Sequence, residues 1–174
     1  MQNNKDMSEH HRVMIIGGIG AGKSSLAAKI NDSEKEVRKT QTLMYDSFTI
    51  DTPGEYIENP FMYKNIIAAS EEADFIMFVQ DINQIRCIFP PGIGRSFNRK
   101  TFGVITKADG SLENLDKVIK HFREIGVSEP YFITSSKTGK GIKELKKFLK
   151  KDLTISPKEA NVSITNTETK KKLK

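Results

Sequence analysis

The glycine-rich segment "GGIGAGKS" at residues 17–24 constrains the fold more than any other part of the sequence. An apolar run typical of a buried strand precedes it at 12–18, and the helix-prone segment "KSSLAAKI" follows at 23–30. A strand that leads through Gly-x4-Gly-Lys-Ser into a helix is the context that the P-loop motif requires. Its glycines let backbone N–H groups face an anion without Cβ clashes. The segment therefore predicts a phosphate-binding loop.

The residues of this loop have separate predicted roles. The ammonium group of Lys23 can reach the β- and γ-phosphates of a nucleotide, and the hydroxyl of Ser24 can ligate Mg²⁺. The helix that starts there directs its positive end to the same place. Glycine-rich turns without a ligand also occur, but the Lys-Ser pair and both flanks favour binding. The predicted phosphate-binding residues are Gly17, Gly18, Gly20, Ala21, Gly22, Lys23, Ser24 and Ser25, and Lys23 is also a predicted catalytic residue.

The rest of the chain alternates between short apolar runs and amphipathic segments, which is typical of a three-layer α/β fold with a parallel sheet. Segment 40–51 departs from this alternation, because two short β-prone pieces flank "DS" without room for a helix. We expect an antiparallel hairpin there and hence a mixed sheet. The predicted strands are 12–18, 74–81, 101–107 and 131–136, and the predicted helices are 23–30, 61–73, 112–126 and 141–151.

Both ends of the chain are polar. Residues 1–11 contain no apolar core of a secretory signal, and residues 154–174 lack the apolar density that folding needs. We expect both segments to be disordered, the second as a basic tail, and one domain to occupy residues 12–153. The longest apolar runs are far shorter than a membrane span. With Cys87 as the single cysteine, the sequence predicts a soluble cytoplasmic protein.

The net charge of +6 is unevenly distributed. Residues 137–174 contain 12 Lys and 4 acidic residues, whereas the remainder of the chain is slightly acidic. No aromatic residues alternate with these lysines and no nucleic-acid signature appears, so we expect no nucleic-acid partner. We interpret the lysines of 141–151 as a solvated helix face, with a weak anionic partner as the alternative.

Two further motifs follow predicted strands. Asp51 ends the second strand of the hairpin, where a carboxylate can hold a water bound to Mg²⁺. In the sequence "DTPG" that starts there, Gly54 would direct a backbone N–H to the γ-phosphate. The next residue is Glu55, and a carboxylate can neither donate a hydrogen bond to a phosphate nor approach it without repulsion. We expect slow hydrolysis without assistance, with Glu55 as a general base or as a solvent-facing turn residue.

The tetrapeptides "TKAD" at 106–109 and "TSSK" at 134–137 predict a base-binding site. An aspartate at position 109 can accept hydrogen bonds from the ring N–H and the amino group of guanine, a donor pair that adenine lacks. The stem of a lysine at 107 can lie along the base, and the backbone of the second box can contact the guanine oxygen. The predicted base-binding residues are Thr106, Lys107, Asp109, Ser135, Ser136 and Lys137.

These motifs resemble those of translation-factor and Ras-like P-loop GTPases. The chain is most similar to the small P-loop proteins of ethanolamine and propanediol utilisation, the EutP/PduV family, over about residues 12–151. The pieces that carry the resemblance are "KTQ" at 39–41, "YDSFTIDTPGEYIENP" at 45–60, "VQD" at 79–81, "IFPPG" at 88–92, "SFN" at 96–98 and "GVITK" at 103–107. The resemblance implies a Ras-like G domain in a bacterial cytosolic protein that acts beside a microcompartment, with a shell or pathway protein as a partner.

The resemblance also implies a Mg²⁺ site and leaves the nucleotide open. Ser24 and Asp51 would hold the metal, and the switch threonine would be Thr40 or Thr42. Thr106 stands where GTPases have asparagine, which removes one amide tether and loosens the preference for guanine. Some members of the family are linked to acetate kinase activity, so both GTP and ATP are retained as ligands.

The segment 86–100 combines apolar residues with rigid prolines and contains no predicted helix. Its apolar side chains either fold beneath the loop or form a docking surface for a partner. Arg86, Arg95 and Arg99 are candidates for a cation near a transferred phosphate. The leading hypothesis is a nucleotide-dependent switch or slow GTPase. The alternatives are a kinase that transfers the γ-phosphate of ATP to a small carboxylate, and an interaction module with vestigial catalysis.

Overall fold

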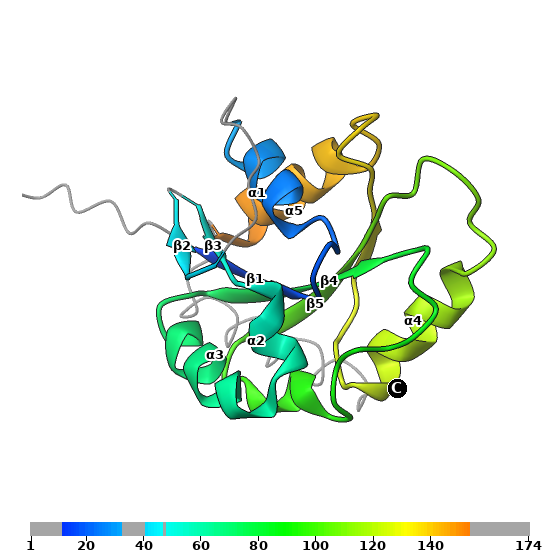
Figure 1. The fold of residues 1–174 in the computed structure, drawn as a ribbon. Coiled ribbons are helices and arrows are strands. Elements are labelled where there is room, and N and C mark those ends of the chain that lie inside the picture. The colour runs from blue at the N-terminus through cyan, green and yellow to red at the C-terminus, as the bar shows by residue number, and fades with distance from the viewer. Residues whose placement is uncertain (1–11, 33–40, 47, 154–174) are drawn as a thin grey trace, which may run out of the picture.

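A computed structural model describes residues 12–32, 41–46 and 48–153, which form a sheet with helices on both faces (Figure 1). The six strands lie in the order β2-β3-β1-β4-β5-β6, and all neighbours are parallel except β2 and β3. The predicted mixed sheet with one antiparallel hairpin is confirmed. The strands are β1 Val13–Gly17, β2 Met44–Tyr45, β3 Thr49–Asp51, β4 Phe75–Asp81, β5 Lys100–Thr106 and β6 Tyr131–Ile133.

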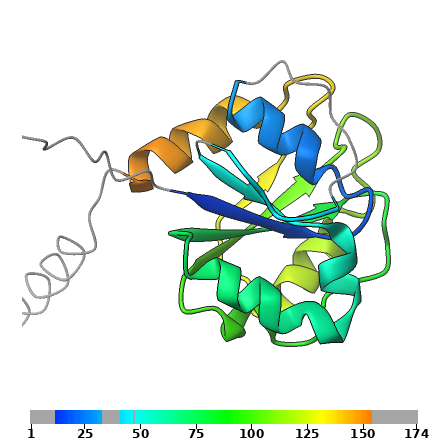
Figure 2. The ribbon, with the colours of Figure 1, turned by 60° about the vertical axis from the view of Figure 1, so that its left-hand side comes forward.

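The helices form the two outer layers. Helices α1 (Lys23–Ile30) and α5 (Ile142–Leu153) cover one face of the sheet. Helices α2 (Gly54–Glu58), α3 (Tyr63–Ser70) and α4 (Leu115–Glu124) cover the other, as the turned view in Figure 2 also shows. Short 3₁₀ helices lie at Pro60–Met62 and Ile93–Ser96. The predicted three-layer α/β architecture is therefore confirmed.

Two apolar clusters, one on each side of the sheet, form the core. Alternate residues of β4 belong to different clusters: Phe78 packs on the α3 and α4 side, whereas Met77 and Val79 pack on the α1 and α5 side. Both faces of the central strands are buried, so their sequences are continuously apolar and show no alternation. This burial is the physical reason why the apolar runs predicted these strands.

The structure differs from the sequence-based prediction in the segment after β3. Where we expected a turn, Gly54–Glu58 forms the short helix α2, with Pro53 in the position before its first residue. The predicted helix 61–73 is divided into the 3₁₀ turn and α3. Pro60 is the first residue of the 3₁₀ turn, where its fixed φ suits a helical turn, whereas Pro53 precedes α2 with an extended backbone.

The segment between β4 and β5 folds its apolar side chains inward. Phe89, Ile93 and Phe97 are buried, and the rings of Phe89 and Phe97 meet Phe78 edge to face. This observation supports the first of the two alternatives for the segment, a loop packed on its own apolar residues. The segment also contains the 3₁₀ turn Ile93–Ser96. The sequence did not predict this turn, because the prolines and glycines of the segment obscure any helical period.

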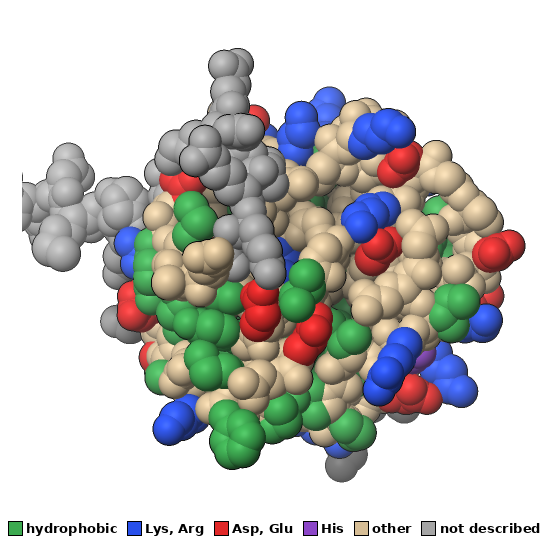
Figure 3. Space-filling model, viewed as in Figure 1, with side chains coloured by type: hydrophobic (Ala, Val, Ile, Leu, Met, Phe, Trp, Pro, Cys, Tyr) green, Lys and Arg blue, Asp and Glu red, His purple; other side chains and the backbone are tan. Residues whose placement is uncertain are grey.

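The surface is uneven in polarity. On the face drawn in Figure 3, hydrophobic side chains gather over α2 and α3. Exposed apolar residues include Phe61 in the 3₁₀ turn and Ile67 on α3, and also Met44 and Tyr45 of β2. Across the described residues, every helix is too short or too polar to span a bilayer.

Candidate functional site

The glycine-rich loop lies at the carboxyl edge of the sheet, between β1 and α1 (Figure 1). Gly20 and Gly22 have φ values of 73° and 89°, a region that favours glycine. Gly17 lies against β4, since a Cβ added there would be 2.4 Å from the carbonyl oxygen of Val79. The backbone path of the loop thus depends on these glycines.

Lys23 is held inside the loop. Its side chain is 6% exposed, and its Nζ donates a hydrogen bond to the carbonyl oxygen of Gly18 at 2.8 Å. Burial lowers the pKa of the Lys23 ammonium group, and the negative charges of Asp51, Glu55 and Glu58 oppose that shift. The ammonium group is thus bonded to the loop backbone and is under the electrostatic influence of three carboxylates.

Two oxygen-bearing side chains meet beside this ammonium group. Ser24 Oγ donates a hydrogen bond to Asp51 Oδ2 at 2.6 Å, and Asp51 is 5% exposed. A hydroxyl and a carboxylate at this separation are hard oxygen donors of the kind that Mg²⁺ prefers, so the pair fits the predicted metal. Of the two candidate threonines, Thr42 is exposed and Thr40 lies outside the described residues.

Helix α2 packs on the first half of the loop. A Cβ added to Gly54 would be 2.5 Å from the backbone nitrogen of Ile19, so the start of α2 touches the loop backbone. The N–H of Ile19 donates a hydrogen bond to Glu58 Oε1 at 2.8 Å. Glu55 is half-buried, and its charge acts on Lys23. Sequence reasoning missed Glu58, because nothing local indicated that this segment is helical or faces the loop.

A cavity of about 430 Å³ opens next to the second half of the loop. It lies at the ends of β4, β5 and β6 and includes every residue predicted for base binding. Asn83 and Gly110 also line it and were not predicted; both follow strand ends, which is the signal that could have found them. The lining residues are Gly22, Ser25, Asn83, Thr106, Lys107, Asp109, Gly110, Ser135, Ser136 and Lys137.

The polar side chains of this cavity orient one another. Ser135 Oγ donates a hydrogen bond to Asp109 Oδ1 at 2.9 Å, and Lys137 Nζ lies 3.9 Å from Asp109 Oδ2. Lys107 Nζ is 2.7 Å from Asp81 Oδ2, a carboxylate at the end of β4. These contacts hold the Asp109 carboxylate and the Lys107 stem at the edge of the cavity.

Thr106 connects the cavity to the loop. Its hydroxyl donates a hydrogen bond to the carbonyl oxygen of Ala21 at 2.6 Å, and its side chain is 2% exposed. The residue lacks the amide of an asparagine, but its hydroxyl still joins β5 to the loop. Thr106 therefore positions the loop, while Asp109 presents the polar group at the cavity edge.

Two of the three candidate arginines of segment 86–100 contact other parts of the molecule. Arg99 donates to the carbonyl oxygen and the carboxylate of Glu71, which follows α3. Arg95 packs against Gly126 after α4. Neither of these contacts is at the glycine-rich loop.

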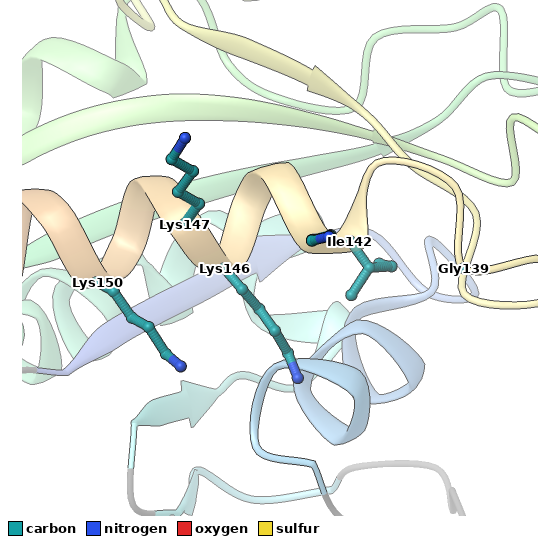
Figure 4. Close-up of a pocket in the computed structure, with 6 residues that line it drawn as sticks. Gly139, Ile142, Lys146, Lys147 and Lys150 are labelled. Atoms are coloured by element: carbon teal, nitrogen blue, oxygen red, sulfur yellow. The ribbon is translucent and has the colours of Figure 1, made fainter.

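A second hollow of about 810 Å³ lies over α5 (Figure 4). Lys146 and Lys150 point to one side of the helix and Lys147 to the opposite side, and Lys146 forms an ion pair with Asp32. The hollow is lined by one helix and the turn before it, mostly through lysines, and it matches the lysine face predicted from the sequence. Its lining residues are Gly139, Ile142, Lys143, Lys146, Lys147 and Lys150.

The fold and the site define a P-loop protein of the GTPase-like class. The family model PduV-EutP, described as "Ethanolamine utilisation - propanediol utilisation", matches residues 10–151, and the chain belongs to this family. It is 33% identical over 138 residues to "Propanediol utilization protein PduV" of Citrobacter freundii. The matched region covers 79% of this chain and 92% of that protein. It is 29% identical over 140 residues to "Probable acetate kinase EutP" of Escherichia coli strain K12, covering 79% of this chain and 88% of that protein.

Solved structures of GTP-binding proteins share the fold. The bacterial selenocysteine-specific elongation factor EF-Sec superimposes with a TM-score of 0.64 at 23% identity, over 84% of this chain and 29% of that protein. A probable GTP-binding protein, engB, superimposes with a TM-score of 0.63 at 19% identity, over 78% of this chain and 94% of that protein. At these identities the likeness establishes the arrangement of strands and helices.

Proposed function

We propose that the chain binds a purine nucleoside triphosphate with Mg²⁺, prefers GTP to ATP, and acts as a slow GTPase or switch in ethanolamine or propanediol utilisation. The observation that carries this proposal is that the glycine-rich loop and the base cavity adjoin each other. Gly22 and Ser25 belong to the glycine-rich loop and also line the cavity that contains Asp109. A base in that cavity would have its phosphates along the loop, next to Lys23.

The preference for guanine rests on Asp109. Because Ser135 holds one carboxylate oxygen, the group has a defined orientation at the cavity edge. Guanine offers two adjacent N–H donors to such a carboxylate, and adenine offers no equivalent pair. ATP remains a second ligand, because the buried Thr106 donates its hydroxyl proton to the loop and not to the base.

The metal belongs to the phosphate half of the site. Ser24 and Asp51 would hold Mg²⁺, with Thr40 or Thr42 as a further ligand. Held by these residues, Mg²⁺ would supply positive charge to offset the charge of the phosphates during phosphoryl transfer. Asp51 and Ser24 already lie within hydrogen-bond distance, so little rearrangement of these two side chains is needed.

The charge around the γ-phosphate position supports slow turnover. Glu55 and Glu58 both act on Lys23, so a triphosphate would place its most charged group beside carboxylates. Slow hydrolysis would leave a bound triphosphate intact for long periods, as a switch requires. Membership of the utilisation family supports a cytoplasmic protein that acts beside a microcompartment, with a shell or pathway protein as its partner.

A second candidate is the transfer of the ATP γ-phosphate to a small carboxylate. A relative at 29% identity is named a probable acetate kinase. In this chain the N–H of Ile19, in the first half of the loop, already donates a hydrogen bond to a carboxylate, that of Glu58. Phosphate release and acetyl phosphate formation, measured with and without acetate, distinguish this candidate from a GTPase.

Titration of the full chain with GTP and ATP, with and without Mg²⁺, tests the proposal. Lys23→Ala should lower the affinity for both by about 100-fold, because a buried cation in contact with the phosphates is lost. Lys147→Ala removes an exposed lysine of α5 and serves as the matched control. If Lys147→Ala abolishes binding and Lys23→Ala leaves it unchanged, the nucleotide binds over α5 and the proposal is wrong.

A further inference from the structure

Glu58 accepts a hydrogen bond from a backbone N–H of the glycine-rich loop. The N–H of Ile19 donates to Glu58 Oε1 at 2.8 Å, although the two residues are 39 positions apart. A Cβ built on Gly18 would meet the same oxygen at 3.1 Å, so the carboxylate lies directly on the loop. A carboxylate on a loop N–H takes the kind of position that a phosphate oxygen takes in an anion-binding loop.

Glu58 contacts a part of the loop that does not line the base cavity. That cavity is lined by Gly22 and Ser25, at the second half of the loop. Ile19 and Gly18 belong to the first half, where Lys23 Nζ is bonded and where Gly54 touches the backbone. A nucleotide that starts in the cavity and follows the loop would therefore bring its last phosphate towards Glu58.

The charge of Glu58 acts on the same cation that a terminal phosphate would use. Its negative charge is one of three that stabilise the ammonium form of Lys23. A γ-phosphate would compete with Glu58 for Lys23 and for the Ile19 N–H, and the two anions would repel each other. A diphosphate ends one phosphate earlier and avoids this competition.

We propose that Glu58 determines the selectivity between nucleoside diphosphate and triphosphate, by holding the place of the terminal phosphate until a triphosphate displaces it. This inference rests on the proposed nucleotide binding and adds a residue that sets its specificity. Glu58 lies on α2, a helix of five residues, so its displacement from Ile19 removes the hydrogen bond between α2 and the loop and leaves the packing of Gly54 as the remaining contact. Triphosphate binding is thereby coupled to the position of α2.

The test compares GDP with the non-hydrolysable GTP analogue that has a β,γ-imido group, titrated into the full chain at fixed Mg²⁺. In Glu58→Gln the carboxylate charge is removed while size and shape are kept. We expect the affinity for the triphosphate to rise about tenfold relative to that for GDP, the size expected for one charge-assisted hydrogen bond. Glu124→Gln, which removes an exposed charge at the end of α4, should leave the ratio unchanged.

The contact itself is tested without nucleotide. In ¹H–¹⁵N spectra of the nucleotide-free protein, the Ile19 amide resonance should shift upfield in Glu58→Ala, which removes the acceptor oxygen, and less in Glu58→Gln, whose amide oxygen can still accept. An unchanged Ile19 resonance overturns the inference.

Three results of the titration overturn the inference. They are an unchanged ratio, equal gains for GDP and the triphosphate, and a selective loss of triphosphate affinity. If the wild-type protein binds neither nucleotide, the proposed function fails and this inference with it. If the wild-type protein binds both and Glu58→Gln does not alter the ratio, this inference alone fails.

Discussion

The two ends of the glycine-rich loop are built differently. At the base end, residues at or just after the ends of β4, β5 and β6 are joined to one another and to the loop by the contacts Ser135–Asp109, Lys107–Asp81 and Thr106–Ala21. At the phosphate end, the five-residue helix α2 reaches the loop through Gly54 and one hydrogen bond from Ile19 to Glu58. Side chains at strand ends are held by the sheet, whereas a short helix gains little stability of its own. We therefore propose that the sheet edge recognises the base and that α2 shifts when the phosphates bind.

The largest effect is expected from a change that separates α2 from the loop. Gly54→Ala places a Cβ within 2.5 Å of the Ile19 nitrogen, so either the loop or α2 must move. We expect a loss of about 2 kcal/mol in the free energy of unfolding, as in other overpacked sites, and weaker binding of triphosphates. Urea denaturation and nucleotide titration measure the two quantities.

Gly110→Ala provides the matched change at the base end. A Cβ added to Gly110 meets nothing within 4 Å, so stability should be unaffected. Equal losses of stability in the two variants would show that the close contact of α2 with the loop has no special role.

Asp109→Asn sharpens the comparison at the base end. The amide would present one N–H₂ group where the carboxylate accepts from guanine, so we expect GTP affinity to fall about tenfold relative to ATP affinity. Isothermal titration with both nucleotides measures this ratio. Equal losses for GTP and ATP would contradict the assignment of guanine recognition to Asp109.

The smallest effect is expected at the connection between the two ends. Thr106→Ala removes the hydroxyl that donates to the Ala21 carbonyl, a buried contact, so the free energy of unfolding should fall by about 1 kcal/mol. GTP and ATP should lose affinity by the same factor, because the loop and not the base is affected.

Thr106→Ser keeps the hydroxyl and should behave like the wild-type protein. A selective loss of GTP affinity in Thr106→Ala would show instead that this residue contacts the base.

Much of the fold follows from local patterns. The predicted helix 23–30 has the same bounds as α1, because an apolar strand and a glycine-rich turn leave little choice of where a helix begins. The hairpin at 40–51 was expected from two short β-prone pieces, and β2 and β3 pair antiparallel. The residues predicted for the base site all line one cavity, since the carboxyl ends of parallel strands meet at one edge of a sheet.

Contacts between distant segments decided the rest. The bond from Thr106 to Ala21 spans 85 positions, and the bond from Ile19 to Glu58 spans 39. Burial of Phe89 and Phe97 against Phe78 likewise depends on how the segment 86–100 returns to the sheet. Periodicity and motif spacing describe neighbours along the chain, so they could predict the loop, the strands and the base residues. Packing in three dimensions decides which acceptor the Thr106 hydroxyl bonds to and which carboxylate contacts the loop. A single sequence pattern does not encode that packing.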